Sequence, residues 1–201
     1  MPVPASLAVV ADDAATCTRC SLATGRTNVV FGMGDPGSDL MFIGEGPGAE
    51  EDKQGLPFVG RSGQLLDRLM AEEMGLTRDR VYIANVVKCR PPNNRDPLPD
   101  EIDACRPFLE AQLELIAPKV VVTLGNFAGK LLLRSKDGIT KLRGRSYPFA
   151  TGVLVPTVHP AYVLRGGGEP MAQMRADLVR AKQALADAGS PLVTSPTGTD
   201  R

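Results

Sequence analysis

The chain has 201 residues, 43% of them hydrophobic and 23% charged, which is enough to bury the core of one globular domain. Its formal net charge of +0 excludes a protein that attracts nucleic acid through its overall charge, so any such surface must be a local patch. No apolar run approaches the roughly 18 residues of a membrane span, and no basic segment precedes the apolar stretch near the N-terminus, so we expect a cytoplasmic protein without membrane contact.

Strand-like and helix-like segments alternate along the chain. Apolar runs predict buried strands over 39–46, 80–89, 119–125 and 147–160, the last with a turn at Thr151 and Gly152. Helical spacing predicts helices over 62–75, 98–118, 126–134 and 170–189, the first three with Ser62, Asp100 and Asn126 as N-caps. This order predicts one α/β domain over 1–187, a three-layer αβα arrangement around a mainly parallel four-stranded sheet. The Ser-, Thr-, Pro- and Gly-rich segment 188–201 is predicted to be a disordered tail.

Four cysteines form a close pair and two distant single residues, namely Cys17 and Cys20 in "CTRC", then Cys89 and Cys105. Two disulfides are disfavoured because cytosolic thiols stay reduced. Four unrelated core thiols are an alternative, although three of the cysteines stand in polar, Arg-bearing or Pro-bearing loops. One four-cysteine metal site suits the spacing and would tie the N-terminal segment to the loop over 88–96. The residues alone do not separate zinc from an iron–sulfur cluster.

The segment "GEGPGAEEDKQGLPFVG" (44–60) joins alternating glycines to a run of acids. It lacks the motif of a phosphate-binding loop and that of a dinucleotide fingerprint, and its acids would repel a phosphate. The glycines would instead let backbone N–H groups approach a flat ligand closely. The alternative is a tight strand-to-helix turn with solvated acids.

Polar residues gather where the predicted strands end, which is the edge at which ligands bind in such sheets. Asn85 lies near the end of the second predicted strand, and the sole histidine, His159, lies where the fourth ends. Phe58 is either a core residue or a platform on which a base stacks. Asn85 is either a satisfied structural residue or a reader of an amide edge, because it offers one donor and one acceptor. Two basic runs, 88–95 and 134–145, are either solvated faces or phosphate contacts.

These residues resemble the family 4 uracil-DNA glycosylases of the iron–sulfur type. The resemblance covers about residues 10 to 185 and is carried by the segments 17–32, 44–67, 82–105 and 156–165, with the spacing of all four cysteines. It implies the uracil-DNA glycosylase fold and a [4Fe–4S] cluster on Cys17, Cys20, Cys89 and Cys105. It also implies hydrolysis of the N-glycosidic bond of deoxyuridine in single- or double-stranded DNA, which leaves an abasic site for base excision repair. We expect a monomer.

The resemblance also implies roles for individual residues. Phe58 would stack on the extruded uracil, Asn85 would read its edge, and His159 would donate to O2 of the departing base. Glu45 would handle the water or the cationic sugar and is preferred among the acids of this loop, in which Ala49 stands where relatives often carry an acid. The uracil would also contact the backbone of Gly46, Pro47 and Gly48. DNA contacts are expected from Lys88, Arg90, Arg95, Leu164 and Arg165, with Leu164 and Arg165 in the loop that enters the duplex.

Residues 90–104 contain no histidine and no insertion of the kind through which some relatives trap DNA covalently, so we expect turnover without an adduct. Two other functions remain open from the residues alone. One is a zinc-stapled module that binds damaged or single-stranded DNA without cleaving it. The other is a redox role for the cysteine site, although no flavin or nicotinamide motif accompanies it.

Overall fold

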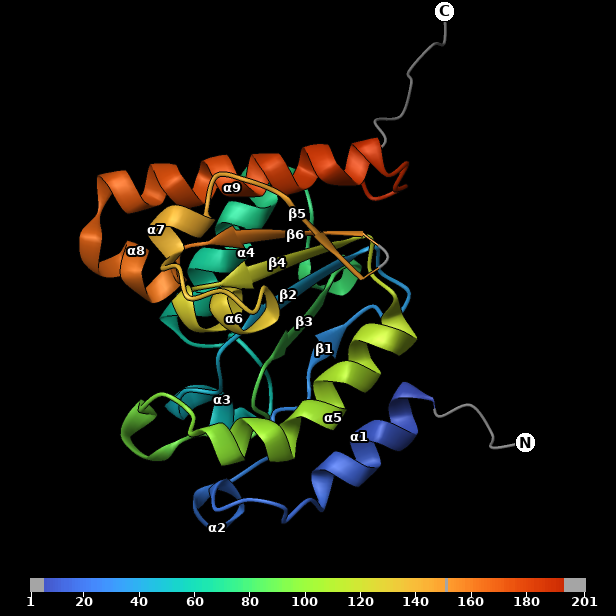
Figure 1. The fold of residues 1–201 in the computed structure, drawn as a ribbon, viewed down its shortest axis with the longest axis vertical. Coiled ribbons are helices and arrows are strands. Elements are labelled where there is room, and N and C mark those ends of the chain that lie inside the picture. The colour runs from blue at the N-terminus through green and yellow to red at the C-terminus, as the bar shows by residue number, and fades with distance from the viewer. Residues whose placement is uncertain (1–5, 151, 194–201) are drawn as a thin grey trace, which may run out of the picture.

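A computed structural model describes residues 6–150 and 152–193 and contains one six-stranded sheet with the strand order β1-β3-β2-β4-β6-β5 (Figure 1). The strands are β1 (Met33–Gly34), β2 (Leu40–Gly44), β3 (Tyr82–Asn85), β4 (Val120–Leu124), β5 (Tyr147–Phe149) and β6 (Gly152–Thr157). The four inner strands are parallel, as predicted, while the short edge strands β1 and β5 are antiparallel and extend the sheet beyond the four strands expected. The predicted run 147–160 contains both β5 and β6. Of the predicted turn, Gly152 begins β6 and Thr151 lies outside the described residues.

Helices cover both faces of the sheet, which confirms the three layers. The helices are α1 (Leu7–Ala15), α2 (Leu22–Gly25), α3 (Ala49–Gln54), α4 (Arg61–Met74), α5 (Pro99–Ile116), α6 (Asn126–Leu132), α7 (Ile139–Leu142), α8 (Pro160–Gly166) and α9 (Gly168–Asp187). Because side chains alternate along a strand, Leu40 and Phe42 of β2 pack against α4, α8 and α9. Met41 and Ile43 face the opposite core, with α1, α5 and α6. Within the described residues, no helix is both long and apolar enough to cross a membrane.

Three predicted helix caps are wrong by one or two positions. Helix α4 begins at Arg61 with Gly60 as N-cap, and α5 begins at Pro99 with Leu98 as N-cap. Proline is favoured at the first helical position because its missing N–H has no partner there in any case. Helix α6 begins at Asn126 after Gly125, whose φ of 100° suits glycine. The Asn126 side chain instead accepts a hydrogen bond from the backbone N–H of Ile139 at 3.0 Å.

The domain extends beyond the predicted boundary at residue 187. Ser190 is fully buried, and its backbone N–H donates to the carbonyl of Leu185 at 2.9 Å. Leu192 and Val193 then pack against the core that lies beneath α9. The prediction of a tail therefore fails for 188–193, where two apolar residues and a turn at Gly189 return the chain to the core. Its remaining part, 194–201, lies outside the described residues.

Candidate active site

A cleft of about 660 Å³ opens at the carboxyl edge of the sheet, between the segment that follows β2 and the start of α8. Three loops with no sequence continuity supply its walls, so the parallel topology alone brings them together. Most of the residues predicted for the site line it, namely Glu45, Gly46, Pro47, Gly48, Phe58, Asn85, Arg95, His159 and Arg165. Three predicted DNA contacts, Lys88, Arg90 and Leu164, do not line the cleft.

The floor of the cleft is made by Phe58 and Asn85, which meet over Gly44. A Cβ atom added at Gly44 would lie 2.4 Å from Oδ1 of Asn85 and 2.6 Å from Cζ of Phe58, so only glycine lets these two side chains approach. Oδ1 of Asn85 is buried and has no hydrogen-bond partner among the described residues. A buried acceptor without a partner costs about 1–3 kcal/mol. The floor therefore presents an aromatic face beside an acceptor that a ligand N–H group can satisfy.

Arg78 holds the backbone of Phe58 in an uncommon conformation. Phe58 has a φ of 53°, in the left-handed region that residues other than glycine rarely adopt. The Arg78 guanidinium donates to the carbonyls of Phe58 and Pro57, the latter at 3.0 Å, and its Nε donates to Oδ1 of Asp67 at 2.6 Å. Helix α4 adds to this constraint, because a Cβ at Gly63 would lie 1.6 Å from the Phe58 carbonyl oxygen. Sequence reasoning missed Arg78, whose partners lie 11 or more residues away.

Replacement of Arg78 by methionine is expected to weaken ligand binding at the cleft floor while leaving the sheet intact, because methionine keeps the apolar stem but loses every donor to the Phe58 loop. For uracil-containing DNA, the substrate that the sequence resemblance implies, we expect the KM to rise about tenfold, equivalent to about 1.4 kcal/mol, with a smaller change in kcat. Steady-state kinetics test this. Arg68 on α4, which is exposed and weakly paired with Glu72 at 3.8 Å, provides the control as Arg68→Met. Equal kinetics in the two variants would show that Arg78 does not position Phe58.

His159 stands at the N-cap of α8 with its ring directed into the cleft. Nδ1 accepts a hydrogen bond from the backbone N–H of Ala161 at 3.1 Å, so the proton of the neutral ring resides on Nε2. Burial, and secondarily the charge of Arg165, lowers the pKa of His159 to about 4. The imidazole is therefore neutral at pH 7. Its ring centroid lies 6.0 Å from that of Phe58, which sets a donor beside the aromatic floor.

The acids of the loop have separate tasks. Glu51 accepts hydrogen bonds at 2.9 Å from two backbone N–H groups at the start of α4, Asp52 accepts from that of Thr27, and Glu50 pairs with Lys53 on the surface. Glu45 lines the cleft, and its carboxyl group lies beside that of Asp96. Burial, and then the nearby carboxylate of Asp96, raises the pKa of Glu45 to about 7. Glu45 is thus the acid of this segment best placed for chemistry.

The expectation that Lys88 contacts DNA is wrong. Its side chain is 1% exposed and donates to the backbone carbonyl of Asn85 at 2.7 Å and to the side chain of Gln112. Burial lowers the pKa of Lys88 to about 7. The basic run looked polar in sequence because a lysine in a loop is usually solvated. Here Lys88 braces the end of β3, and so supports Asn85.

The other predicted DNA contacts differ in whether their side chains are free to bind DNA. The guanidinium of Arg95 is already paired, because it binds both carboxylate oxygens of Glu101, at 2.6 and 2.8 Å. Arg90 donates to the side chain of Asn94 at 2.8 Å and forms no ion pair within the described residues. Arg165 is exposed at the rim of the cleft, and Leu164 is 42% exposed on α8. These positions remain open to a macromolecular ligand.

All four cysteines line one small cavity enclosed by the N-terminal segment, the end of β3 and α5. None forms a disulfide, and Cys89 and Cys105 are buried. Burial raises the pKa of Cys105 to about 11 and raises that of Cys89, so both stay protonated until a strongly positive partner displaces the protons. Arg26 donates to Sγ of Cys89 at 3.5 Å and to the carbonyl of Cys17 at 2.6 Å.

The cysteine cavity has the donor type of a metal site. Four thiols facing one cavity suit either a zinc ion or an iron–sulfur cluster. Across the described residues, no three His, Cys, Asp or Glu side chains are grouped closely enough to hold a metal ion as they stand.

Glu101 fastens the segment between Cys89 and Cys105. Its buried carboxylate accepts from Ser21 at 3.0 Å and from the backbone of Leu98 at 2.8 Å, besides binding Arg95. The hydrogen bonds and charge of Arg95, with those of the other donors, lower the pKa of Glu101 to about 2.

Glu101→Gln is therefore expected to lower the Tm at pH 6. A depressed pKa gives stability that is present above the unfolded value of about 4.5 and is lost as the pH falls toward 2. The difference in Tm from the wild type should accordingly narrow between pH 4.5 and pH 2, as followed by circular dichroism. Glu110→Gln, at an exposed position of the same helix, should show no such trend. A difference that stays constant with pH would contradict the assignment.

Sequence similarity to known proteins agrees with this geometry. The model of the uracil-DNA glycosylase superfamily matches residues 31–184. The chain is 48% identical over 168 residues to a type-4 uracil-DNA glycosylase of Sulfurisphaera tokodaii, which covers 79% of this chain and 76% of the relative. It is 46% identical over 184 residues to the type-4 enzyme of Thermotoga maritima, covering 90% and 95% of the two chains. The chain belongs to the type-4 family of uracil-DNA glycosylases.

Likeness to another branch is weaker. A type-5 uracil-DNA glycosylase of Thermus thermophilus is 34% identical over 142 residues, which cover 63% of this chain and 62% of that protein. The resemblance stated from the sequence is therefore confirmed at the level of the family. In this uracil-DNA glycosylase family member, the superfamily match spans the glycine loop, Phe58, Asn85 and His159, the same residues that the structure gathers around the cleft.

Proposed function

We propose that this chain is a monofunctional uracil-DNA glycosylase, which hydrolyses the N-glycosidic bond of deoxyuridine in DNA, releases uracil and leaves an abasic site for base excision repair. One observation carries the proposal. The unpartnered Oδ1 of Asn85, the face of Phe58 and the Nε2–H of a neutral His159 converge in one cleft. Uracil offers an N–H group, a flat ring and a carbonyl oxygen to these three features in turn.

Base recognition follows from this floor. The uracil ring stacks on Phe58, and its N3–H donates to Oδ1 of Asn85, which removes the cost of an unpaired buried acceptor. The backbone of Gly46, Pro47 and Gly48 forms the wall that faces the base. A base can enter only after leaving the duplex stack, which costs a few kcal/mol. Leu164, exposed on α8, is placed to fill the space it leaves, as an apolar wedge does.

Bond cleavage uses His159 and Glu45. As the C1′–N1 bond breaks, its electron pair goes to the uracil ring, and His159 Nε2–H donates to O2 where the negative charge develops. The sugar becomes cation-like, and the Glu45 carboxylate stabilises it. Water then adds to C1′ and gives its proton to Glu45, while the uracil anion is later protonated by solvent. Every proton and electron pair is accounted for without a covalent enzyme intermediate.

The four cysteines are proposed to hold a [4Fe–4S] cluster on Cys17, Cys20, Cys89 and Cys105. When bound, such a group supplies folding free energy by joining three distant segments of the chain. The residues around it, Arg26 and the backbone N–H of Lys88, each donate to a cysteine sulfur. Iron and acid-labile sulfide analysis of anaerobically purified protein tests the assignment, with about four of each expected per chain. Zinc in place of iron would overturn it.

We further propose that the protein acts as a monomer in the cytoplasm on single- or double-stranded DNA. A reducing compartment keeps the four thiols available for the cluster. The cleft is built from residues of one chain, so the reaction needs no second subunit. Sedimentation of the protein with and without a DNA duplex tests the monomer.

The glycosylase assay uses a labelled oligonucleotide with one deoxyuridine, followed by alkali, which cuts at abasic sites. Cleavage at uracil, and none at thymine or cytosine, is the expected result. A shifted band without cleavage would replace the glycosylase by a DNA-binding module. A protein–DNA band that survives denaturation would contradict the absence of a covalent intermediate.

A further inference from the structure

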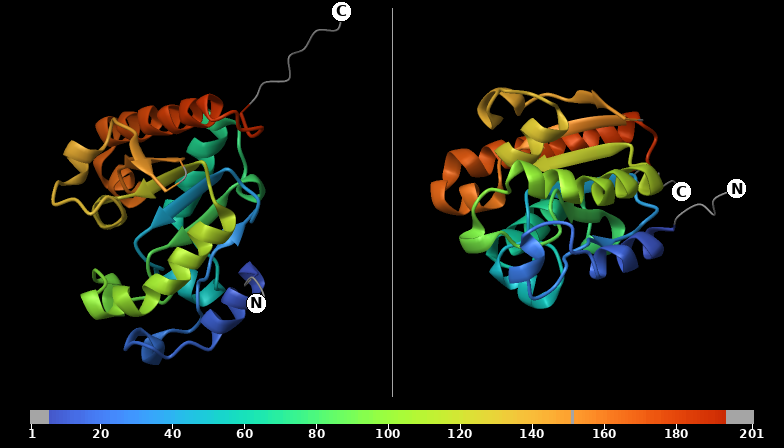
Figure 2. Two further views of the ribbon diagram at one scale, coloured as in Figure 1. Left: turned by 45° about the vertical axis from the view of Figure 1, so that its right-hand side comes forward. Right: turned by 60° about the horizontal axis from the view of Figure 1, so that its bottom comes forward.

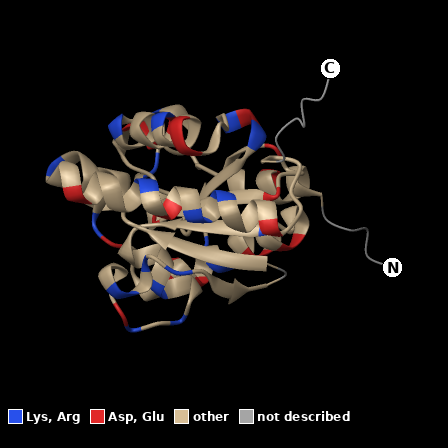
Figure 3. Ribbon diagram, turned by 90° about the horizontal axis from the view of Figure 1, so that it is seen from above, with Lys and Arg blue, Asp and Glu red and all other residues tan. Residues whose placement is uncertain are grey.

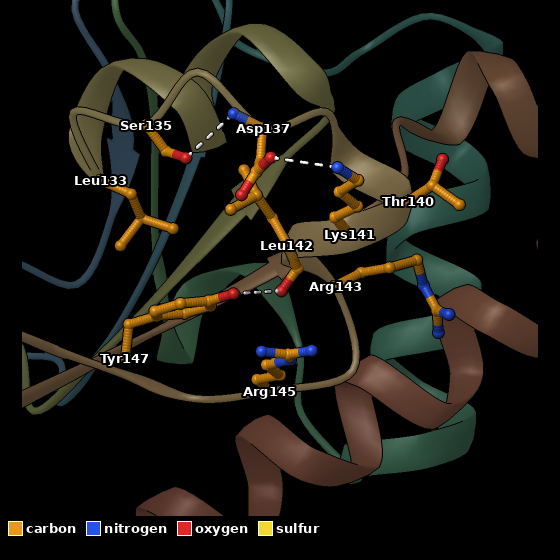
Figure 4. A pocket seen from close by; sticks show the side chains of 9 residues that line it. All are labelled: Leu133, Ser135, Asp137, Thr140, Lys141, Leu142, Arg143, Arg145 and Tyr147. Atoms are coloured by element: carbon orange, nitrogen blue, oxygen red, sulfur yellow. Dashed lines mark hydrogen bonds and ion pairs between the residues drawn. The ribbon is translucent and has the colours of Figure 1, made fainter.

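A second cavity, of about 500 Å³, lies outside the cleft and is formed by the segment 133–147 (Figure 4). We call it the basic pocket and define it by Ser135, Thr140, Lys141, Arg145 and Tyr147, which line it. Asp137, Arg143 and two leucines complete its wall, so hydroxyl and cationic groups outnumber the single acid. Neither Ser135 nor Arg145 belongs to the machinery described above.

The two cations of the basic pocket differ in whether they have a partner of opposite charge. Lys141 pairs with Asp137 at 3.5 Å, and both side chains are more than half exposed, so this pair is weak. Arg145 is exposed and forms no ion pair within the part of the chain that the structure describes. In Figure 4 its guanidinium lies across the cavity from the Lys141–Asp137 pair. An anion that enters would meet Arg145 first and could draw Lys141 away from Asp137.

The segment that forms the basic pocket is anchored rather than free. Arg143 binds the buried carboxylate of Asp177 at 2.9 and 3.1 Å and the carbonyl of Gln173 at 3.0 Å. The Tyr147 hydroxyl donates to the carbonyl of Leu142 at 2.9 Å. Of the two arginines that flank Gly144, one thus secures the loop to α9 and the other faces outward. A fixed cation without an internal partner suits an external anion.

The anchoring also places the basic pocket on the edge that holds the cleft. The backbone N–H of Ile139, at the start of α7, donates to the side chain of Asn126. Asn126 follows Gly125, whose backbone packs against the His159 side chain. Figure 2 shows the segment 133–147 and the loop over 90–98 projecting on the same side of the molecule. The two segments therefore face the same side of the molecule.

With a formal net charge of +0, the protein must bind DNA through local basic groups. Figure 3 shows, in the view from above, Lys and Arg interspersed with Asp and Glu over the elements of the fold, in keeping with the formal net charge of +0. Lys88 is buried and Arg95 is bound to Glu101, which leaves Arg61 and Arg165 at the cleft and Arg90 near it. Phosphate contacts supply most of the affinity for DNA and fix its position, so a basic site outside the cleft would add to both.

We propose that the basic pocket binds a backbone phosphodiester of the DNA strand that flanks the extruded nucleotide, with Arg145 as its principal contact and Lys141 as the second. This inference rests on the proposed function, because it assumes DNA in the cleft. It assigns to the segment 133–147 a role in holding DNA that is separate from base recognition and from bond cleavage.

The test compares Arg145→Gln, Lys141→Gln and the double variant with Arg180→Gln, an exposed arginine of α9 on another part of the chain. Affinity for a duplex with an abasic-site analogue is measured by fluorescence anisotropy over a range of salt. Loss of one phosphate contact should lower the slope of log K against log[salt] by about 0.9. We expect that change for Arg145→Gln, with a severalfold loss of affinity, and no change for Arg180→Gln. The single-turnover excision rate at saturating enzyme should stay at the wild-type value.

The outcomes separate the two proposals. Wild-type excision of uracil with unchanged salt slopes in both single variants and in the double variant would overturn the phosphate site alone. Absence of excision by the wild type, with a lower slope for Arg145→Gln, would overturn the glycosylase while retaining the DNA contact. Arg145-dependent binding of inorganic phosphate, measured by calorimetry, with unchanged DNA slopes would make this a free-phosphate site and so overturn the DNA source.

Methylphosphonate substitution locates the contact. Neutralising one phosphate at a time should remove the effect of Arg145→Gln at a single position near the uracil. An effect that persists at every substituted position would show that no phosphate occupies the pocket.

Discussion

His159→Ala is expected to slow uracil excision by about 10²–10³-fold, equivalent to about 3–4 kcal/mol, with the affinity for uracil-containing DNA nearly unchanged. The reason is that Nε2–H faces the point at which charge develops only as the bond breaks, so its loss affects the transition state more than the bound ground state. Single-turnover rates at saturating enzyme test this directly. An unchanged rate would show that the donor is elsewhere.

The pH dependence sharpens this prediction. Because burial lowers the pKa of His159 to about 4, the ring should remain a neutral donor throughout pH 5.5 to 9, and no kinetic step should appear near the ordinary histidine value of about 6.5. The chain has one histidine, so one imidazole resonance reports its titration without ambiguity. A shift of that resonance between pH 6 and 7 would contradict the neutral-donor assignment.

Glu45→Gln is expected to slow excision by about 10²–10⁴-fold, the usual cost of losing a general base. In the wild type the rate should fall on the acid side with an apparent pKa near 7, because burial and then Asp96 raise the pKa of Glu45 to about 7 and the carboxylate form is the active one. Removing the neighbouring charge in Asp96→Asn lowers the pKa of Glu45, so this limb should move to lower pH. Glu110→Gln, at an exposed position of α5 away from the cleft, should leave the rate unchanged.

The same buried acid should reduce stability. A raised folded pKa means that ionisation above pH about 4.5 costs the folded state more than the unfolded chain. Glu45→Gln should therefore have a higher Tm than the wild type at pH 8, and this gain should vanish at pH 4, where both states carry the proton. Thermal unfolding at the two pH values measures it. If activity is lost without any gain in Tm at pH 8, Glu45 is not a desolvated acid.

Sequence patterns predicted well what depends on a residue and its near neighbours. The apolar runs placed the four parallel strands, and their carboxyl ends then brought Asn85, Phe58 and His159 together. The cap positions failed by one or two residues because glycine and proline begin these helices. Lys88 was predicted wrongly because nothing in the nearby sequence shows that Gln112, 24 residues away, would accept a hydrogen bond from it in the core. Arg78 and Asp96 were missed for a similar reason, because each acts on a site residue from a segment distant in sequence.

The span from Cys89 to Cys105 belongs to two parts of the protein at once. Cys89 and Cys105, at its two ends, line the cysteine cavity. Asp96, within it, lies beside Glu45 in the cleft. Ser21 donates a hydrogen bond to Glu101 and so holds the segment against the N-terminal part of the chain. We therefore expect chemical modification of either thiol to disturb the backbone that carries Asp96, and with it the surroundings of the Glu45 carboxylate. When the protein is incubated with an oxidant or an alkylating reagent, the loss of activity and the loss of folded structure should have the same half-life.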